Sequence, residues 1–150
     1  MAVIEYARNV KKIRYANSTE ISEKCKDPVI DLMTSQKEII NKGGTMRLGA
    51  WDCEIEKNTK SYKCYKKKLI SERHRHRYEF NNNYTDRISD DKFVIAGSNP
   101  DTKLVEIVEN IDHPWFVGVQ FHPEYKSSVY NPHPIFVNFV KASLKKYLNK

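Results

Sequence analysis

The sequence predicts an α/β domain in which helices flank a layered sheet. Apolar residues recur with helical period at both ends of the chain, and short strand-like segments lie between them. A nearly continuous apolar stretch over residues 115–121 is typical of a strand that is covered on both faces. From its 150 residues we expect one modest domain, without an internal repeat, a linker or a second domain.

The first helix is predicted over residues 2–10, where apolar side chains form one stripe: Ala2, Val3, Tyr6, Ala7 and Val10. No Ser, Thr, Asp or turn precedes this stripe, although such a residue normally caps the first turn of a helix. We therefore expect this helix to have lost its beginning.

Turns and two strands are predicted next. A turn over residues 16–19 leads to a short strand over residues 29–33. A polar run then reaches a tight turn at Gly43-Gly44, because adjacent glycines favour turns. A second strand is expected over residues 45–55, and its apolar side chains share one face: Met46, Leu48 and Ala50, with Cys53 as a further candidate.

The second half of the chain predicts a hairpin and a final helix. Residues 58–68 fit either a surface loop or a weak helix, residues 71–83 show no core period, and residues 84–90 fit a short helix. Strands over residues 93–97 and 104–109 predict a hairpin, the second strand being half-buried, with a turn over residues 98–101. Pro134 suits the first turn of a helix over residues 135–148, whose apolar stripe is Phe136, Val140 and Leu144.

Composition excludes several classes of function. The net charge is +7, but the basic residues are scattered along the chain, so nucleic-acid binding is not predicted. The longest apolar stretch is too short to span a bilayer, and no apolar leader follows Met1. The three cysteines form no C-x-x-C pair, which argues against a disulfide scaffold and a zinc site. We expect no metal site, no membrane segment and a reducing, cytoplasmic location.

A histidine and a glutamate directly follow the most apolar strand, in the segment Gln120-Phe121-His122-Pro123-Glu124. On an extended backbone, residues two apart project to the same side, with their Cα atoms about 6–7 Å apart. The carboxylate can then orient the imidazole, as in a nucleophile–His–acid triad. Active sites also lie beyond the carboxyl ends of strands in α/β sheets. We predict that His122 and Glu124 form a catalytic pair; the alternative is a solvent-facing turn.

Residues 72–81 contain a second unusual polar segment. Strand alternation places its basic and aromatic side chains on opposite faces: Arg73, Arg75 and Arg77 on one, His74, His76 and Tyr78 on the other. Guanidinium groups that face a pocket suit an anionic ligand such as a carboxylate or phosphate. The alternatives are a charged edge strand, or a metal site for which no third ligand is evident. Residues 43–50 offer a weaker signal, either ligand-binding backbone amides or a plain turn.

Four segments resemble the C-terminal glutaminase domain of the CTP synthase family in order and approximate spacing: Ala16–Glu20 (ANSTE), Gly43–Gly49 (GGTMRLG), Glu72–Glu79 (ERHRHRYE) and Gln120–Glu124 (QFHPE). The F-H-P-E ending is shared by class I glutamine amidotransferases, whereas the second and third segments are specific to CTP synthases. The resemblance implies a class I amidotransferase fold, with a flavodoxin-like layered sheet and flanking helices. Residues 1–150 are expected to be the C-terminal part of that domain.

The resemblance also implies a reaction. A cysteine attacks the side-chain amide of L-glutamine, and the released ammonia passes to a synthase domain that uses ATP and Mg²⁺ to aminate UTP to CTP. By this resemblance His122 is the general base that activates the thiol, and Glu124 holds it. Glu20 matches the acid that binds the glutamine α-ammonium, and Arg77 matches the basic glutamine-binding position.

The family pattern is only partly present. The family's nucleophile lies in a Gly-x-Cys-x-Gly elbow ahead of the first helix, and Cys25, Cys53 and Cys64 do not match that position. We therefore expect the first strands, the elbow and the synthase domain to be missing, and the chain alone to be inactive. The whole enzyme is expected to be a tetramer. The alternative is a non-catalytic amidotransferase remnant that binds glutamine or a protein partner.

Overall fold

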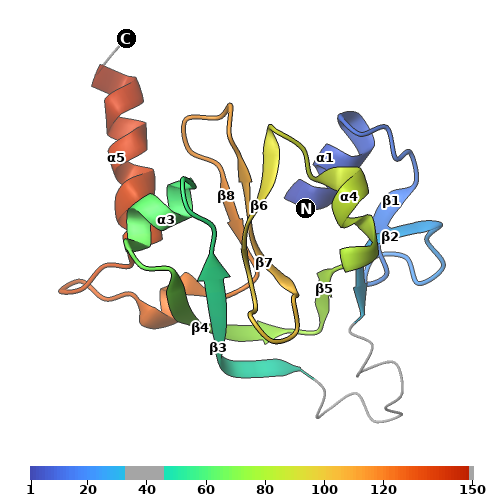
Figure 1. The fold of residues 1–150 in the computed structure, drawn as a ribbon, viewed down its shortest axis with the longest axis horizontal. Coiled ribbons are helices and arrows are strands. Elements are labelled where there is room, and N and C mark those ends of the chain that lie inside the picture. The colour runs from blue at the N-terminus through green and yellow to red at the C-terminus, as the bar shows by residue number, and fades with distance from the viewer. Residues whose placement is uncertain (33–45, 149–150) are drawn as a thin grey trace. The chain divides into compact units, whose positions relative to one another are not determined.

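The structure, a computed structural model of the chain, describes residues 1–32 and 46–148 (Figure 1). Its strands form two sheets, and the chain divides into two compact units. Residues 1–48 and 75–90 make the first unit, and residues 49–74 and 91–150 make the second. The predicted polar run and Gly43-Gly44 turn lie outside the described residues. No described helix combines the length and apolar character that crossing a membrane requires.

The first unit contains a three-stranded sheet with the order β1-β2-β5. Strand β1 runs parallel to β2, and β5 runs antiparallel to β2. The elements of this unit are α1 (Ala2–Asn9), β1 (Ala16–Ser18), β2 (Asp27–Leu32), β5 (Tyr78–Phe80), the 3-10 helix η2 (Asn82–Tyr84) and α4 (Thr85–Ile88). Helix α1 packs against β1, β2 and α4. The predicted first helix, the first predicted strand and the short helix are thus confirmed.

Two details of the first unit differ from the predictions. The expected turn over residues 16–19 is wrong, because Ala16–Ser18 form β1, whose hydrogen bonds come from β2 and not from any local preference. Val10 is exposed although it was placed on the apolar stripe of α1. The buried face of α1 is made instead by Val3, Ile4, Tyr6 and Ala7.

The second unit contains a five-stranded sheet with the order β4-β3-β6-β7-β8. The pairs β3–β6, β6–β7 and β7–β8 are antiparallel. Its elements are β3 (Arg47–Ile55), α3 (Lys60–Tyr65), β4 (Leu69–His76), β6 (Phe93–Ser98), β7 (Val105–Asn110), β8 (Val117–Val119), the 3-10 helix η3 (Pro123–Lys126) and α5 (Pro134–Leu148). The first two residues of β3 and the last two of β4 belong to the first unit. Its core consists of Cys53, Ile55, Ile70, Ala96, Ile107, Phe121 and Ile135.

Strand β3 presents the opposite face to the one predicted at its start. Leu48 is 60% exposed, whereas the neighbouring Arg47 is 3% exposed. The Arg47 guanidinium lies 3.8 Å from the carboxylate of Glu79, which is also buried. A buried guanidinium with an acidic partner therefore takes the inward position that the apolar Leu48 was expected to fill.

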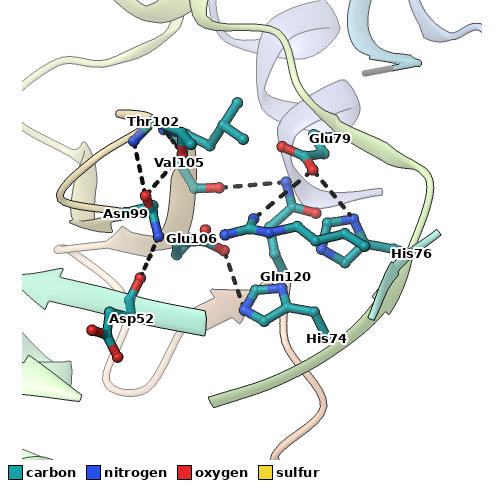
Figure 2. Close-up of polar contacts among 11 residues, drawn as sticks. Asp52, His74, His76, Glu79, Asn99, Thr102, Val105, Glu106 and Gln120 are labelled. Carbon is teal, nitrogen blue, oxygen red and sulfur yellow. Dashed lines mark hydrogen bonds and ion pairs between the residues drawn. The ribbon is translucent and has the colours of Figure 1, made fainter. Parts of the chain in front are cut away.

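Strand β4 has a core period, contrary to the prediction for residues 71–83. Its inward positions are Ile70, Glu72 and His74, which alternate with exposed neighbours. A search for regularly spaced apolar residues does not detect this alternation, because two of the three buried positions are polar. His74 Nε2 faces Glu106 Oε2 of β7 at 3.7 Å, and both side chains are fully buried (Figure 2).

The predicted β6–β7 hairpin is confirmed. Asn99 organises its turn, because its Oδ1 accepts hydrogen bonds from the backbone N–H groups of Asp101 and Thr102. Its Nδ2 donates to the carbonyl of Asp52 (Figure 2). Strand β7 is buried along most of its length, so the expectation of a half-buried strand is wrong.

Residues 58–68, which fitted a loop or a helix, contain helix α3. Thr59 Oγ1 caps it by accepting a hydrogen bond from the N–H of Tyr62. The fully buried Glu109 of β7 adds a second cap: its two carboxylate oxygens accept hydrogen bonds from the N–H groups of Lys60 and Ser61 at 2.8 and 2.7 Å. Carboxylates stabilise the N-terminal end of a helix, whose N–H groups lack partners within the helix.

The C-terminal elements correct two further expectations. Strand β8 is shorter than the predicted 115–121 and half-buried, because it ends the sheet order. Helix α5 is confirmed, and it packs against α3 (Figure 1). Its buried residue is Ile135 in the first turn, whereas the predicted stripe is exposed: Phe136, Val140 and Leu144.

Candidate active site

The segment that follows β8 turns sharply at Pro123. Proline suits the first position of a helix because its φ is already near the helical value and its missing N–H is not needed there. Two hydrogen bonds close the 3-10 helix η3: Tyr125 N–H to His122 O at 3.2 Å and Ser127 N–H to Glu124 O at 3.3 Å. Glu124 thus lies in a turn, and the expectation that the backbone is extended through this residue is wrong.

The turn nevertheless brings the side chains of His122 and Glu124 together. His122 Nδ1 lies 2.6 Å from Glu124 Oε1. The side chains are 36% and 54% exposed, respectively. Because a carboxylate only accepts, Nδ1 carries the proton and donates it, which leaves the lone pair of the ring on Nε2. This hydrogen bond also holds the pKa of Glu124 below its ordinary value.

Two further contacts restrain His122, one at its ring and one at its backbone. The ring of Tyr125 stacks on the imidazole, with centroids 5.1 Å apart and planes 23° apart. The backbone N–H of His122 donates to the carbonyl of Arg73 on β4 at 2.8 Å. Glu124 therefore fixes the ring within its plane, and Tyr125 covers one face of it.

A polar cluster lies next to this turn. It consists of the buried side chains of Glu72 of β4 and His133, which precedes α5, and of the half-buried Tyr65 of α3. Glu72 Oε1 accepts a hydrogen bond from the Tyr65 hydroxyl at 3.0 Å and lies 3.1 Å from His133 Nε2. Burial, followed by the charge of Glu72, raises the pKa of Tyr65 well above its usual range. Sequence reasoning gave this cluster no role, because its members come from three distant segments.

The two glutamine-binding candidates lie in the first unit, whereas His122 and Glu124 lie in the second. Glu20 is in the turn after β1, with an exposed side chain and its N–H bonded to Ser18 Oγ. Arg77 is half-buried between β4 and β5. The structure thus joins the predicted catalytic pair, and the roles of Glu20 and Arg77 stay predictions.

The arginine-rich face of β4 is exposed at Arg73 and Arg75. Strand β4 ends the sheet order, as the charged-edge alternative required. On the opposite side of this segment, His76 Nδ1 lies 3.9 Å from Glu79 Oε1 (Figure 2). Within residues 1–32 and 46–148, no group of three or more His, Cys, Asp and Glu side chains is arranged to hold a metal ion.

The cysteines are all free thiols in environments that disfavour a thiolate. Cys53 is fully buried in the core of the second unit. Burial raises the pKa of Cys64 to about 11, and it also raises the pKa of Cys25. A catalytic cysteine has a lowered pKa, whereas the pKa values of Cys25 and Cys64 are raised and Cys53 is buried.

Comparison with known proteins settles the family. The family model described as "Glutamine amidotransferase class-I" matches residues 1–142. The chain belongs to the class I glutamine amidotransferases. Among members of the family, it is 60% identical to the CTP synthase of Flavobacterium johnsoniae over 144 residues, which cover 96% of this chain and 27% of that enzyme. It is 59% identical to the CTP synthase of Christiangramia forsetii, covering 95% of this chain and 26% of that enzyme.

A solved amidotransferase structure confirms the predicted fold class. The Trypanosoma brucei CTPS glutaminase domain with bound acivicin matches with a TM-score of 0.87 and 38% identity, over 96% of this chain and 56% of that chain. The chain spans about a quarter of the length of the curated CTP synthases that it matches. The resemblance inferred from the motifs is confirmed.

Proposed function

We propose that residues 1–150 form the C-terminal part of a CTP synthase glutaminase domain. In this proposal the domain hydrolyses L-glutamine and supplies ammonia for the ATP-dependent amination of UTP to CTP. The observation that carries it is the 2.6 Å contact between His122 Nδ1 and Glu124 Oε1, within a chain that is 60% identical to a CTP synthase.

The geometry supports a base and its orienting acid. Nε2 of His122 holds the lone pair, so it can take the proton of an attacking thiol and later return it to the leaving ammonia. Glu124 stays ionised at neutral pH because its pKa is held low, and it can stabilise the imidazolium that forms. In this scheme Glu20 binds the α-ammonium of glutamine, and Arg77 provides the complementary positive charge.

The nucleophile is assigned to a part of the enzyme outside this chain. The thiols of Cys25, Cys53 and Cys64 are buried or have raised pKa values, so none of them suits the reaction. We accordingly propose that the 150-residue chain alone releases no ammonia from glutamine. ATP and Mg²⁺ are assigned to the synthase domain, and a cytoplasmic tetramer is proposed for the whole enzyme.

A chimeric enzyme tests the proposal. This chain replaces the aligned segment of the Flavobacterium johnsoniae CTP synthase, and CTP formation is measured with glutamine and, separately, with ammonia. His122→Ala should lower the glutamine-dependent kcat at least about a thousandfold, since the general base is lost, and leave the ammonia-dependent rate unchanged.

The matched control is His113→Ala, because His113 is an exposed histidine of the same unit and should leave both rates unchanged. A His122→Ala chimera with the parent glutamine-dependent rate contradicts the role of His122. The proposal that the nucleophile lies outside residues 1–150 is contradicted if the purified chain hydrolyses glutamine faster than its His122→Ala variant.

A further inference from the structure

The turn that carries His122 and Glu124 is fastened to β4 at both of its ends. At the start, the His122 N–H donates to Arg73 O at 2.8 Å. At the end, Lys126 Nζ donates to Ser71 O at 2.5 Å. Carbonyls two residues apart on a strand point to the same edge, and β4 ends the sheet order. The turn therefore occupies the outer edge of β4, where main-chain carbonyls would otherwise lack strand partners.

Between these two anchors, the side chain of Glu72 points into the protein and is 3% exposed. The Ile135 N–H donates to His133 Nδ1 at 3.4 Å, so the ring proton lies on Nε2, from which it is donated to Glu72 Oε1. The imidazole N–H and the Tyr65 hydroxyl both donate to this one oxygen.

The other oxygen of this carboxylate faces a cation. Lys126 Nζ lies 3.9 Å from Glu72 Oε2, an atom that accepts no hydrogen bond from the described residues. A buried carboxylate needs a compensating charge, and removal of the partner leaves that charge uncompensated. The Lys126 ammonium thus has two attachments on β4, a main-chain carbonyl and a buried carboxylate.

We propose that Lys126 is a positioning residue for glutamine hydrolysis. Its ammonium holds the end of η3 against Ser71 and Glu72, so that Glu124, two residues earlier, stays on Nδ1 of His122. Lys126 acts through this turn and does not touch the reacting atoms. The inference rests on the proposed function, because it assigns a role in the same site.

Two measurements on Lys126→Met test the inference. In the chimeric enzyme, its glutamine-dependent kcat should fall about tenfold and its KM for glutamine should change less than about twofold, because misorientation affects the chemical step more than binding. In the 150-residue chain, the ¹⁵N NMR shifts of His122 should change from the Nδ1–H tautomer to a mixture rich in Nε2–H. The ammonia-dependent rate should stay at the parent value.

Two variants serve as controls. Lys126→Arg retains the cation and should recover most of the kcat. Lys92→Met makes the same substitution in an exposed pair with Asp112, whose atoms are 3.3 Å apart, and should change neither the kcat nor the NMR shifts. If Lys126→Met fails to fold, the double variant Glu72→Gln/Lys126→Met, which removes both charges, should fold and show the same loss of kcat.

The inference is overturned if Lys126→Met, or the double variant, has the same glutamine-dependent kcat and the same His122 tautomer as the parent protein. Failure of the proposed function gives a different result: the unmodified chimera lacks glutamine-dependent activity, or His122→Ala leaves that activity intact. In that case the tautomer of His122 in the chain still decides whether Lys126 positions Glu124.

Discussion

Two imidazole–carboxylate pairs lie close to the same turn, and they differ in exposure and in proton placement. His122 and Glu124 are two residues apart in the sequence, partly exposed, and 2.6 Å apart. His133 and Glu72 are 61 residues apart in the sequence, each 3% exposed, and 3.1 Å apart. His122 donates from Nδ1 and keeps a lone pair on Nε2, whereas His133 uses both ring nitrogens within the protein. The same two groups therefore leave a ring nitrogen free for the proposed proton transfer in one place, and form a buried contact between β4 and the start of α5 in the other.

The largest expected difference between the pairs is in stability. His133→Ala should lower the free energy of unfolding by about 2–3 kcal/mol, because the buried Glu72 carboxylate loses a hydrogen-bond donor. His122→Ala should lower it by less than about 0.5 kcal/mol, since that ring is partly exposed. Urea unfolding of the two variants measures both values, and equal losses would contradict the division of roles.

A smaller effect is expected when one hydrogen bond of the buried pair is removed. Tyr65→Phe keeps the ring but removes the donor to Glu72 Oε1, and it should cost about 1–2 kcal/mol of stability. Tyr125→Phe is the matched control: the ring still stacks on His122, so stability should not change measurably. Thermal or urea unfolding compares the two, and a neutral Tyr65→Phe would show that the hydroxyl is dispensable.

The smallest expected effect concerns the titration of Glu124. Its pKa is lower in the folded protein than in the unfolded chain, because His122 donates to it. The resulting stabilisation is present above the unfolded pKa and is lost as the pH falls through the folded pKa. It is small, since the pair is exposed to solvent. Carboxyl ¹³C NMR should give a pKa below the ordinary value for Glu124, which returns to that value in His122→Ala.

The sequence predicted those elements whose apolar residues match a simple period. The helix at residues 2–9, the 93–110 hairpin and the helix at residues 134–148 were predicted correctly for this reason. The core period of β4 was missed, although its strand alternation was noted, because its inward positions include Glu72 and His74, which an apolar count takes as surface. The buried face at the start of β3 was predicted wrongly for the same reason. Arg47 is buried because of an acidic partner, Glu79, that lies 32 positions further along the chain.

The candidate site shows the same limit. His122 and Glu124 were found because both lie in one five-residue motif, although Pro123 turns the backbone between them. The side chains that hold this turn were not found, since they meet only after folding: Tyr65, Glu72, Lys126 and His133. One available signal was the regular alternation that starts at Ile70, in which Glu72 falls at an inward position.

Helix α3 depends on a strand that follows it in the chain. A helix of six residues is too short to persist alone in water. Two N–H groups of its first turn are satisfied by Glu109, a side chain that reaches them only when β7 is in place. We therefore expect α3 to become stable only after the β6–β7 hairpin has formed. When the ribosome has synthesised residues 60–65, the carboxylate that caps them is still absent. About fifty more residues must be added before Glu109 can complete the cap.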